Sequence, residues 1–264
     1  MGGSVYSADG GPTAGTITAG DALAALDEIV FQKKLLTAEQ VAHALETNFE
    51  DRTTEPNGEE IRQILWNKAP KFGNDVDRVD RWVADLADYI GSTYQNDFHN
   101  SRYGKGPVPA CYAYSQSPVT GNIAFGSMVG ALPNGRKGGL PVNNGISPEN
   151  GAELNGPTAA INSIGKLPSI WFQKGAIYNV RLTEDTLTST EGIKRVAALI
   201  KSLFDQKGIH VQFNVVGSEI LRDAQQQPEN YSDLMVRVSG YSAFFTPLAR
   251  KVQNDLIERI EFQA

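Results

Sequence analysis

The residue types that most often perform catalysis or bind metal ions are sparse in this sequence. The histidines are His43, His99 and His210, and the single cysteine is Cys111. None of them stands at the short spacing at which zinc ligands occur, and there is no Gly-x-Ser-x-Gly motif. A histidine on a helix surface or at the start of a strand is more often structural than catalytic. The sequence therefore predicts neither a metal site nor a hydrolytic triad.

A different chemistry is open to Gly240, which lies in the segment Arg-Val-Ser-Gly-Tyr-Ser-Ala at 237–243. A glycine in such a place ordinarily supplies a turn residue with positive φ. Glycine is also the one residue whose Cα can lose a hydrogen atom and flatten with no Cβ in the way. The unpaired electron is then shared with the amide nitrogen on one side and the carbonyl group on the other. The segment is compatible with either role, a turn or a stored carbon radical.

The hydrophobic pattern predicts the elements that would position this glycine. Apolar residues at helical spacing predict helices over 191–204 and 219–225 and a further helix that begins near Pro247. The β-branched run 210–216 and the segment 234–238 are typical of buried strands. Gly240 is thus expected at the tip of a turn that the core encloses. The residues expected to pack around it and exclude water and oxygen are Val236, Val238, Phe244 and Phe245.

The first part of the chain has a mostly helical pattern. Residues 21–30 and 74–90 carry apolar stripes at helical spacing, and a short helix is predicted around 61–65. Thr37 and Gln40 form a capping-box pattern before a further helix.

Two segments lack such stripes. Residues 2–20 are predicted to be a loop, and 100–167, rich in Gly, Pro, Asn and Ser, is predicted to form long loops with short strands.

Composition narrows the class of protein. The chain has 264 residues, 41% of them hydrophobic, and a net charge of −6, which is typical of a globular protein and unfavourable for binding nucleic acid. No stretch approaches about 18 consecutive apolar residues, and the first residues lack the pattern of a secretion signal. A single cysteine suits a reducing compartment. We therefore expect a cytoplasmic protein that does not act at a membrane. The glycine-rich stretches 10–15 and 135–139 match no nucleotide-binding motif.

The segment 237–245 resembles the radical signature of the glycyl radical enzymes, a family that includes pyruvate formate-lyase, choline trimethylamine-lyase and the arylacetate decarboxylases. The similarity is not confined to this segment, and it extends over nearly the whole chain. It continues through residues 21–26, 71–75, 133–137, 156–159, 210–216, 221–224 and 228–237.

The resemblance implies an α/β fold in which this chain supplies the C-terminal part of a ten-stranded α/β barrel of the glycyl radical type, together with the glycine loop. Residues 1–140 would belong to the barrel domain of the pyruvate formate-lyase type, and residues 141–264 would be the glycine radical domain. Gly240 would store the radical. The residues expected to support its loop are Arg237, Val238, Ser239, Tyr241 and Ser242, with Arg237 and Tyr241 acting through hydrogen bonds.

The resemblance also implies partners. A separate activating enzyme, which uses S-adenosylmethionine and a 4Fe–4S cluster, would install the radical, and no cofactor would stay bound to this chain. In the family, the stored radical passes to a cysteine, whose thiyl radical takes a hydrogen atom from a small-molecule substrate. That cysteine stands in a Gly-Cys-x-Glu type motif, which this sequence lacks, and Cys111 is not followed by the acidic residue. We expect a C-terminal portion that is inactive without a Cys-bearing remainder of the barrel or a Cys-bearing partner chain.

The substrate class rests on weaker similarity. Residues 10–20 and 171–179 look more like the arylacetate decarboxylases and arylsuccinate synthases than like pyruvate formate-lyase. The predicted function is therefore thiyl-mediated cleavage of a C–C bond, as in a decarboxylase of the 4-hydroxyphenylacetate type. Tyr6, Trp171 and Phe172 could line an aromatic pocket, although such residues more often belong to a core. The alternative is a stand-alone radical-carrying subunit, or an inactive fragment, that complements a Cys-bearing partner.

Overall fold

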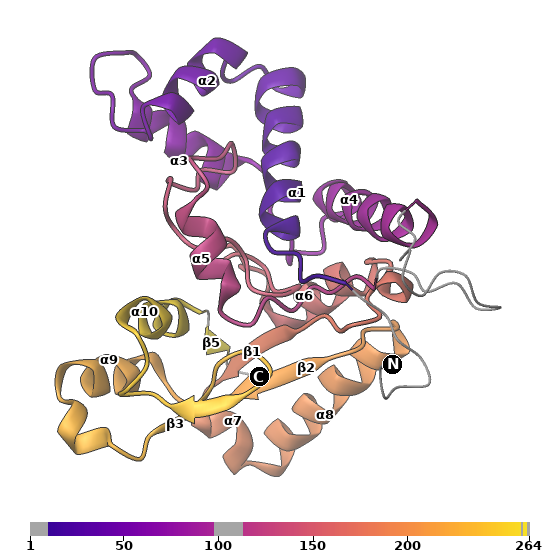
Figure 1. Cartoon of the computed structure of the whole chain (residues 1–264), viewed down its shortest axis with the longest axis vertical. Coiled ribbons are helices and arrows are strands. Elements are labelled where there is room, and N and C mark those ends of the chain that lie inside the picture. The colour runs from indigo at the N-terminus through magenta and orange to yellow at the C-terminus, as the bar shows by residue number, and fades with distance from the viewer. Residues whose placement is uncertain (1–9, 98–112, 260, 263–264) are drawn as a thin grey trace, which may run out of the picture.

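The computed structural model describes residues 10–97, 113–259 and 261–262, and Figure 1 shows their arrangement. Helices from the first part of the chain occupy one end of the molecule. A small sheet with its neighbouring helices occupies the other end.

The helices of the first part form close to where the sequence predicts them. Helix α2 (Ala38–Glu46) begins at a capping box, in which the Gln40 amide donates to Oγ1 of Thr37 and the Thr37 amide donates to Oε1 of Gln40. Helix α3 (Gly58–Lys68) begins at a second capping box, and the long helix α4 (Asp77–Asn96) starts slightly later than the pattern indicates. These predictions are confirmed.

The prediction of a loop over residues 2–20 is wrong at its end. Helix α1 (Thr16–Ala25) begins inside this segment and continues as a wider π-helix, Leu26–Gln32. Helix α1 packs along α4 so closely that a Cβ at Gly20 would lie 2.4 Å from Cγ2 of Val83. Because most of its buried residues are glycine, alanine and threonine, a search for large apolar residues at helical spacing does not find it.

The segment 100–167 contains helices where only loops and short strands are predicted. Helix α5 (Gly121–Ser127) stands where short strands are expected, and helix α6 (Gly156–Gly165) follows a proline-rich and asparagine-rich stretch. A Cβ at Gly126 would lie 2.3 Å from the carbonyl oxygen of Leu140. Close backbone contacts through small residues therefore position α5, and such contacts leave no hydrophobic period in the sequence.

A parallel sheet has the strand order β2-β1-β5. Its strands are β1 (Tyr178–Leu182), β2 (Val211–Asn214) and β5 (Glu261–Phe262). The connection from β1 to β2 runs through α7 (Glu184–Thr188) and α8 (Thr190–Asp205), so the two strands form a βαβ unit. Strand β2 and helix α8 are confirmed predictions, whereas β1 is not predicted.

The last part of the chain carries an antiparallel hairpin of two strands, β3 (Met235–Arg237) and β4 (Ser242–Phe244). Helix α9 (Ser218–Gln226) and a short 3-10 helix (Pro228–Tyr231) precede it, and helix α10 (Arg250–Glu258) follows it. Strand β3 and helices α9 and α10 lie close to the predicted segments.

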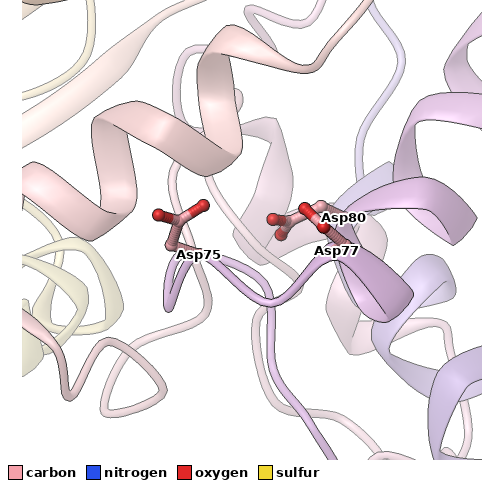
Figure 2. A group of neighbouring side chains, drawn as sticks. All are labelled: Asp75, Asp77 and Asp80. Carbon is pink, nitrogen blue, oxygen red and sulfur yellow. The ribbon is translucent and has the colours of Figure 1, made fainter.

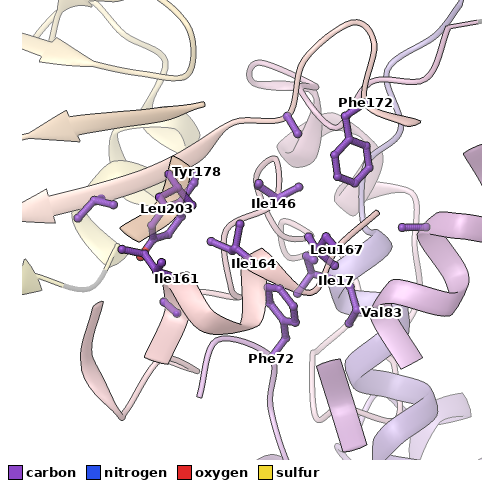
Figure 3. Packing of buried hydrophobic residues seen from close by; sticks show 14 of the residues in the cluster. Ile17, Phe72, Val83, Ile146, Ile161, Ile164, Leu167, Phe172, Tyr178 and Leu203 are labelled. Carbon is purple, nitrogen blue, oxygen red and sulfur yellow. The ribbon is translucent and has the colours of Figure 1, made fainter. Parts of the chain in front are cut away.

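In the described part of the chain, buried apolar side chains form three clusters. The largest joins α1, α4, α6 and the sheet, and Figure 3 shows its members converging, among them Ile17, Val83 and Tyr178. A second cluster lies among α2 and α3. The third lies beneath the hairpin and consists of Leu221, Ala224, Val236, Val238, Phe245, Leu256 and Ile257. The β3–β4 hairpin therefore packs on a small core of its own.

Candidate functional site

Gly240 lies in the loop that joins β3 to β4. The paired strands end at Arg237 and Ser242, and the loop closes with a 2.9 Å hydrogen bond from the Val238 amide to the Tyr241 carbonyl oxygen. Gly240 has a φ of 79°, a conformation that residues with a Cβ rarely adopt. The backbone alone thus favours glycine at this position.

Side chains hold both peptide groups that flank the Gly240 Cα. The Gly240 N–H donates to Oε1 of Gln212 at 2.8 Å, and its carbonyl oxygen accepts from Nη2 of Arg237 at 3.3 Å. Arg237 also donates from Nε to the same Gln212 oxygen at 3.3 Å and from Nη1 to Oγ of Ser242 at 3.2 Å. Gln212 and Arg237 therefore hold the glycine from its two sides.

Neighbouring amides hold Gln212 in turn. It stands on β2 beside Asn179 of β1, and its Nε2 donates to Oδ1 of Asn179. Nδ2 of Asn179 donates to Oδ1 of Asn144 and to Oγ of Ser147, at 3.3 Å each. Ser239 of the loop donates to the same Asn144 oxygen at 2.9 Å. The loop and the sheet therefore meet in one network of uncharged polar groups.

Two further side chains attach the hairpin. Asn214 on β2 accepts a 2.8 Å hydrogen bond from the Arg237 amide and donates to the Arg237 carbonyl oxygen. Arg259 follows α10 in the chain. Its Nη1 donates to the Val238 carbonyl oxygen at 2.8 Å, and its Nη2 donates to Asp255 at 2.9 Å. The backbone on the strand leading into the glycine is thus fixed at consecutive residues.

The two faces of the hairpin differ in exposure. Val236, Val238 and Phe245 are buried beneath the loop, as predicted. Gly240, however, is exposed, and Phe244 is 48% exposed. The prediction of an enclosed loop that Phe244 helps to cover is therefore wrong for the described chain. The reason is that successive strand residues point to opposite faces, which turns Phe244 away from the small core.

Tyr241 also differs from the expectation. Its side chain is 39% exposed, and its hydroxyl group forms no hydrogen bond with any other described residue. Arg237, with its contacts to the Gly240 carbonyl and to Ser242, supplies the side-chain hydrogen bonds within the loop.

The described histidines occupy separate places. On the surface, Nε2 of His43 lies 2.6 Å from Oδ2 of Asp51. His210 directly precedes β2, and burial together with the charge of Arg237 lowers its pKa. His99 lies outside the described residues. The geometry therefore does not place His43 and His210 in one constellation.

Of the aromatic residues considered for a pocket wall, Phe172 has the core role that the sequence favours. Phe172 is buried in the main core, where its ring centroid lies 5.4 Å from that of a buried tyrosine. Trp171 ends a short 3-10 helix (Ser169–Trp171) and donates to an aspartate of α4 at 2.7 Å. Tyr6 and Cys111 lie outside the described residues, so the predictions made for them stay predictions.

One group of carboxylates has the proximity of a metal site, and Figure 2 shows its members, Asp75, Asp77 and Asp80. Nζ of Lys166 lies 2.8, 2.6 and 2.8 Å from their respective oxygens, so an ammonium group occupies the place that a cation would take. The hydrogen bond from Lys166 lowers the pKa of Asp75, whereas burial raises the pKa of Asp80. This cluster is a closed set of ion pairs.

A second carboxyl group lies beside the amide network. Oη of Tyr178 donates to Oε1 of Glu153 at 3.1 Å. Burial raises the pKa of Glu153 to about 8, so the group is mostly uncharged at neutral pH. Glu153, Asn179 and Asn144 line one small hollow. Glu153 therefore contributes little negative charge to this side of the glycine loop at neutral pH.

Two family models match the chain. The model described as pyruvate formate lyase-like covers residues 1–126, and the model described as glycine radical covers residues 142–246. The chain belongs to the glycyl radical enzyme family. The domain boundary expected at residue 140 stays a prediction.

Curated proteins align with almost all of this chain. A probable dehydratase of Escherichia coli (strain K12) is 40% identical over 99% of this chain and 32% of its own length. The trans-4-hydroxy-L-proline dehydratase of Clostridioides difficile is 38% identical over 94% of this chain and 29% of its own length. Isethionate sulfite-lyases and an indoleacetate decarboxylase, 33% identical, also match. The chain spans about a third of the length of these curated relatives.

Solved structures of glycyl radical enzymes share the fold. The B12-independent glycerol dehydratase from Clostridium butyricum superposes with a TM-score of 0.90 and 39% identity, over 100% of this chain and 32% of that chain. The expected α/β fold is confirmed, and it is consistent with a C-terminal part of the glycyl radical barrel. Among the described residues, no helix has both the length and the apolar character needed to cross a membrane.

Sequence reasoning missed the carboxamide side chains near Gly240. Gln212, Asn179 and Asn144 touch the loop or each other, yet none of them is a predicted site residue. A signal for Gln212 was present, because a carboxamide inside a buried, β-branched strand requires hydrogen-bond partners. For Asn144, in a stretch without periodicity, the sequence alone offers no such signal.

Proposed function

We propose that Gly240 is the radical-storage residue of a glycyl radical lyase to which this chain contributes. The observation that carries the proposal is the bare Cα of an exposed glycine whose two flanking peptide groups are fixed by Gln212 and Arg237, within the part of the chain that the glycine radical model matches. A fixed loop keeps the Cα in one place.

The proposed sequence of hydrogen transfers needs two partners. An activating enzyme that uses S-adenosylmethionine removes one hydrogen atom from the Gly240 Cα. A cysteine thiol in the remainder of the whole protein, or in a partner chain, then returns a hydrogen atom to Gly240 and becomes a thiyl radical. The thiyl radical takes a hydrogen atom from the small-molecule substrate, and the substrate radical eliminates its leaving group. This chain supplies the reservoir for the unpaired electron.

For the reaction class, we favour an elimination from a small polar substrate. The curated relatives with 40% and 38% identity carry dehydratase names, and three aligned structures are named for dehydration of glycerol, 1,2-propanediol and hydroxyproline. The sequence favours an arylacetate decarboxylase, and the indoleacetate decarboxylase match keeps that reaction as the second candidate. Phe172 lies in the main core, so it lends no support to an aromatic pocket wall.

Electron paramagnetic resonance tests the storage proposal directly. The chain is incubated without oxygen with an activating enzyme and S-adenosylmethionine. We expect a doublet, because one hydrogen remains on the Cα, and we expect it to collapse when the protein carries Cα-deuterated glycine. Gly240→Ala should abolish the signal. Gly139→Ala is the matched control, since Gly139 also has a φ of 79° but no neighbouring atom within 4 Å of an added Cβ. A doublet that persists in Gly240→Ala would refute the proposal.

The reaction class is tested by adding a Cys-bearing partner to the activated chain. A polyol, a hydroxyproline and an arylacetate are offered as separate substrates. Loss of water from either of the first two supports the elimination, whereas release of carbon dioxide from the third supports the decarboxylase. Turnover that needs the added partner would also show that this chain can act as a separate radical-carrying subunit.

A further inference from the structure

Gln212 is the near end of a chain of carboxamides that all point the same way. Starting from the glycine, the Gly240 N–H donates to Gln212, and Gln212 donates to Asn179. Asn179 donates to Asn144 at 3.3 Å, and Nδ2 of Asn144 donates to Oδ1 of Asn122 at 3.3 Å. The chain ends where Nδ2 of Asn122 donates to Oδ1 of Asp255 at 3.2 Å. Each member accepts on its oxygen from the glycine side and donates from its nitrogen toward Asp255.

The direction of this chain is fixed at both ends. The Gly240 amide can only donate, and an ionised aspartate can only accept. Reversing any one carboxamide would place two donors or two acceptors face to face. The members are also sheltered, because Gln212, Asn144, Asn122 and Asp255 are buried. Aligned hydrogen bonds in a sheltered place polarise one another, so donation along this chain strengthens Oε1 of Gln212 as an acceptor, an oxygen that the glycine N–H shares with Nε of Arg237.

We propose that Gln212 is a positioning residue that raises the electron-donating power of the Gly240 amide nitrogen and so stabilises an unpaired electron on its Cα. An unpaired electron between an amide nitrogen and a carbonyl group is stabilised by donation from the nitrogen and withdrawal by the carbonyl. A strong acceptor on the N–H increases the donation. The Arg237 guanidinium, which donates to the Gly240 carbonyl oxygen, increases the withdrawal. This inference rests on the proposed function of Gly240.

Asn214 shows what a purely structural attachment in the same strand looks like. It stands on β2 with Gln212, but both of its hydrogen bonds go to the backbone of Arg237 and neither reaches Gly240. Gln212 instead bonds to the glycine N–H itself and to the Arg237 side chain. The two amides of β2 therefore have separate tasks, and only one of them can change the electron distribution at the glycine.

The first arm of the test uses the chain before activation. The amide hydrogen exchange of Gly240 is followed by nuclear magnetic resonance in the unchanged chain and in Gln212→Leu, Gln212→Glu and Gln226→Leu. We expect faster exchange in Gln212→Leu alone, because Gln212→Glu keeps an acceptor and Gln226 is an exposed residue of α9. Unchanged exchange in Gln212→Leu would overturn the hydrogen bond on which the inference depends.

The second arm uses the activated chain labelled with 15N-glycine. In Gln212→Leu we expect a smaller 15N hyperfine coupling, a wider proton doublet and a radical yield lower by about two- to tenfold, which is the range that one lost hydrogen bond allows. Gln226→Leu should keep the coupling, and Gln212→Glu, which retains an acceptor on the glycine N–H, should not lower it. Asp255→Asn, at the far end, should reduce the coupling in the same direction but by less.

The outcomes separate the inference from the proposed function. If the unchanged chain forms a radical and its couplings are the same in Gln212→Leu, Gln212 is merely structural and the inference fails while Gly240 keeps its role. If the unchanged chain forms no radical on Gly240, the proposed function fails, and the electronic role of Gln212 fails with it.

Discussion

The carboxylate cluster around Lys166 and the amide network around Gly240 both hold polar side chains together, but the first does so through ion pairs and the second through hydrogen bonds between carboxamides. In the first, three aspartates converge on one ammonium group, which takes the place of a cation among them. In the second, Gln212, Asn179 and Asn144 form a series of hydrogen-bonded carboxamides beside a backbone loop whose glycine Cα they leave bare. The comparison teaches that residues with the usual chemical reactivity can be purely structural, while the atom proposed to react belongs to the backbone.

The largest effect is expected for Gly240→Ala. Oxygen should cut the activated chain beside Gly240, and the variant should show no such cut. Folding should survive, because a Cβ there would meet only Cδ1 of Ile177, at 3.3 Å, and the positive φ costs about 1–2 kcal/mol. Gel electrophoresis after exposure to air measures the cut. If Gly240→Ala gave the same fragments, the Cα of Gly240 would not be the atom that reacts.

Glu153 tests whether the carboxyl group beside the amide network is uncharged. Its pKa is raised to about 8 in the folded protein, so the folded state holds a proton that the unfolded state loses from about pH 4.5 upward. The free energy of unfolding should therefore fall as the pH rises from about 5 to 8. Relative to Glu153→Gln, the unchanged chain should lose about 3 kcal/mol across this range.

Chemical denaturation at several pH values measures this difference. Burial also raises the pKa of Asp21 and Glu149, so the comparison of the two proteins, rather than the slope of either, isolates Glu153. Glu46→Gln, on the exposed side of α2, is the control. Parallel curves for the unchanged chain and Glu153→Gln would mean that Glu153 is charged in the folded state.

Lys166→Met tests the charged side of the comparison. It leaves three carboxylates around a missing cation, one of them on the buried Asp80, and should lower the free energy of unfolding by about 2 kcal/mol. Lys201→Met, which breaks an exposed pair with Asp205, should change it by no more than about 0.5 kcal/mol. Magnesium ions should not stabilise the unchanged chain. A rise in its melting temperature with magnesium would show that the cluster is open to metal ions after all.

The smallest effect is expected for Tyr241→Phe. The Tyr241 hydroxyl bonds to no other described residue, so its removal should change stability by less than about 0.5 kcal/mol and leave the radical signal in place. Tyr178→Phe should cost more, because it removes the hydrogen bond to the buried Glu153. Equal losses of stability in Tyr241→Phe and Tyr178→Phe would contradict the statement that the Tyr241 hydroxyl bonds to no other described residue.

Helices with caps and large apolar stripes could be predicted from the sequence, whereas elements that pack through small residues could not. The capping box of Thr37 and Gln40 and the stripes of α4 and α8 are local signals. Helix α1 packs through residues such as Gly20, and α5 through Gly126, so their contacts depend on neighbours distant in the chain. Strand β1 alternates in burial only weakly, since a parallel strand is covered on both faces.

The candidate site divides in the same way. Gly240 and Arg237 are found from one continuous segment that resembles a family signature. Gln212, Asn179 and Asn144 come from three separate stretches, and only the parallel register of β1 and β2 brings the first two together. The exposure of Gly240 could not be predicted either, because it depends on what covers the outer face of the hairpin.

Asn214 has a consequence for motion. Its carboxamide gives the Arg237 backbone the N–H and C=O contacts that an adjacent strand would give, and the described residues show no main-chain hydrogen bond between β2 and β3. Detaching the hairpin therefore requires side chains to rotate and does not require main-chain hydrogen bonds between strands to break. The small core beneath the hairpin can move together with it. We expect the Arg237 amide to exchange with heavy water sooner than that of Val180, which is held inside the sheet.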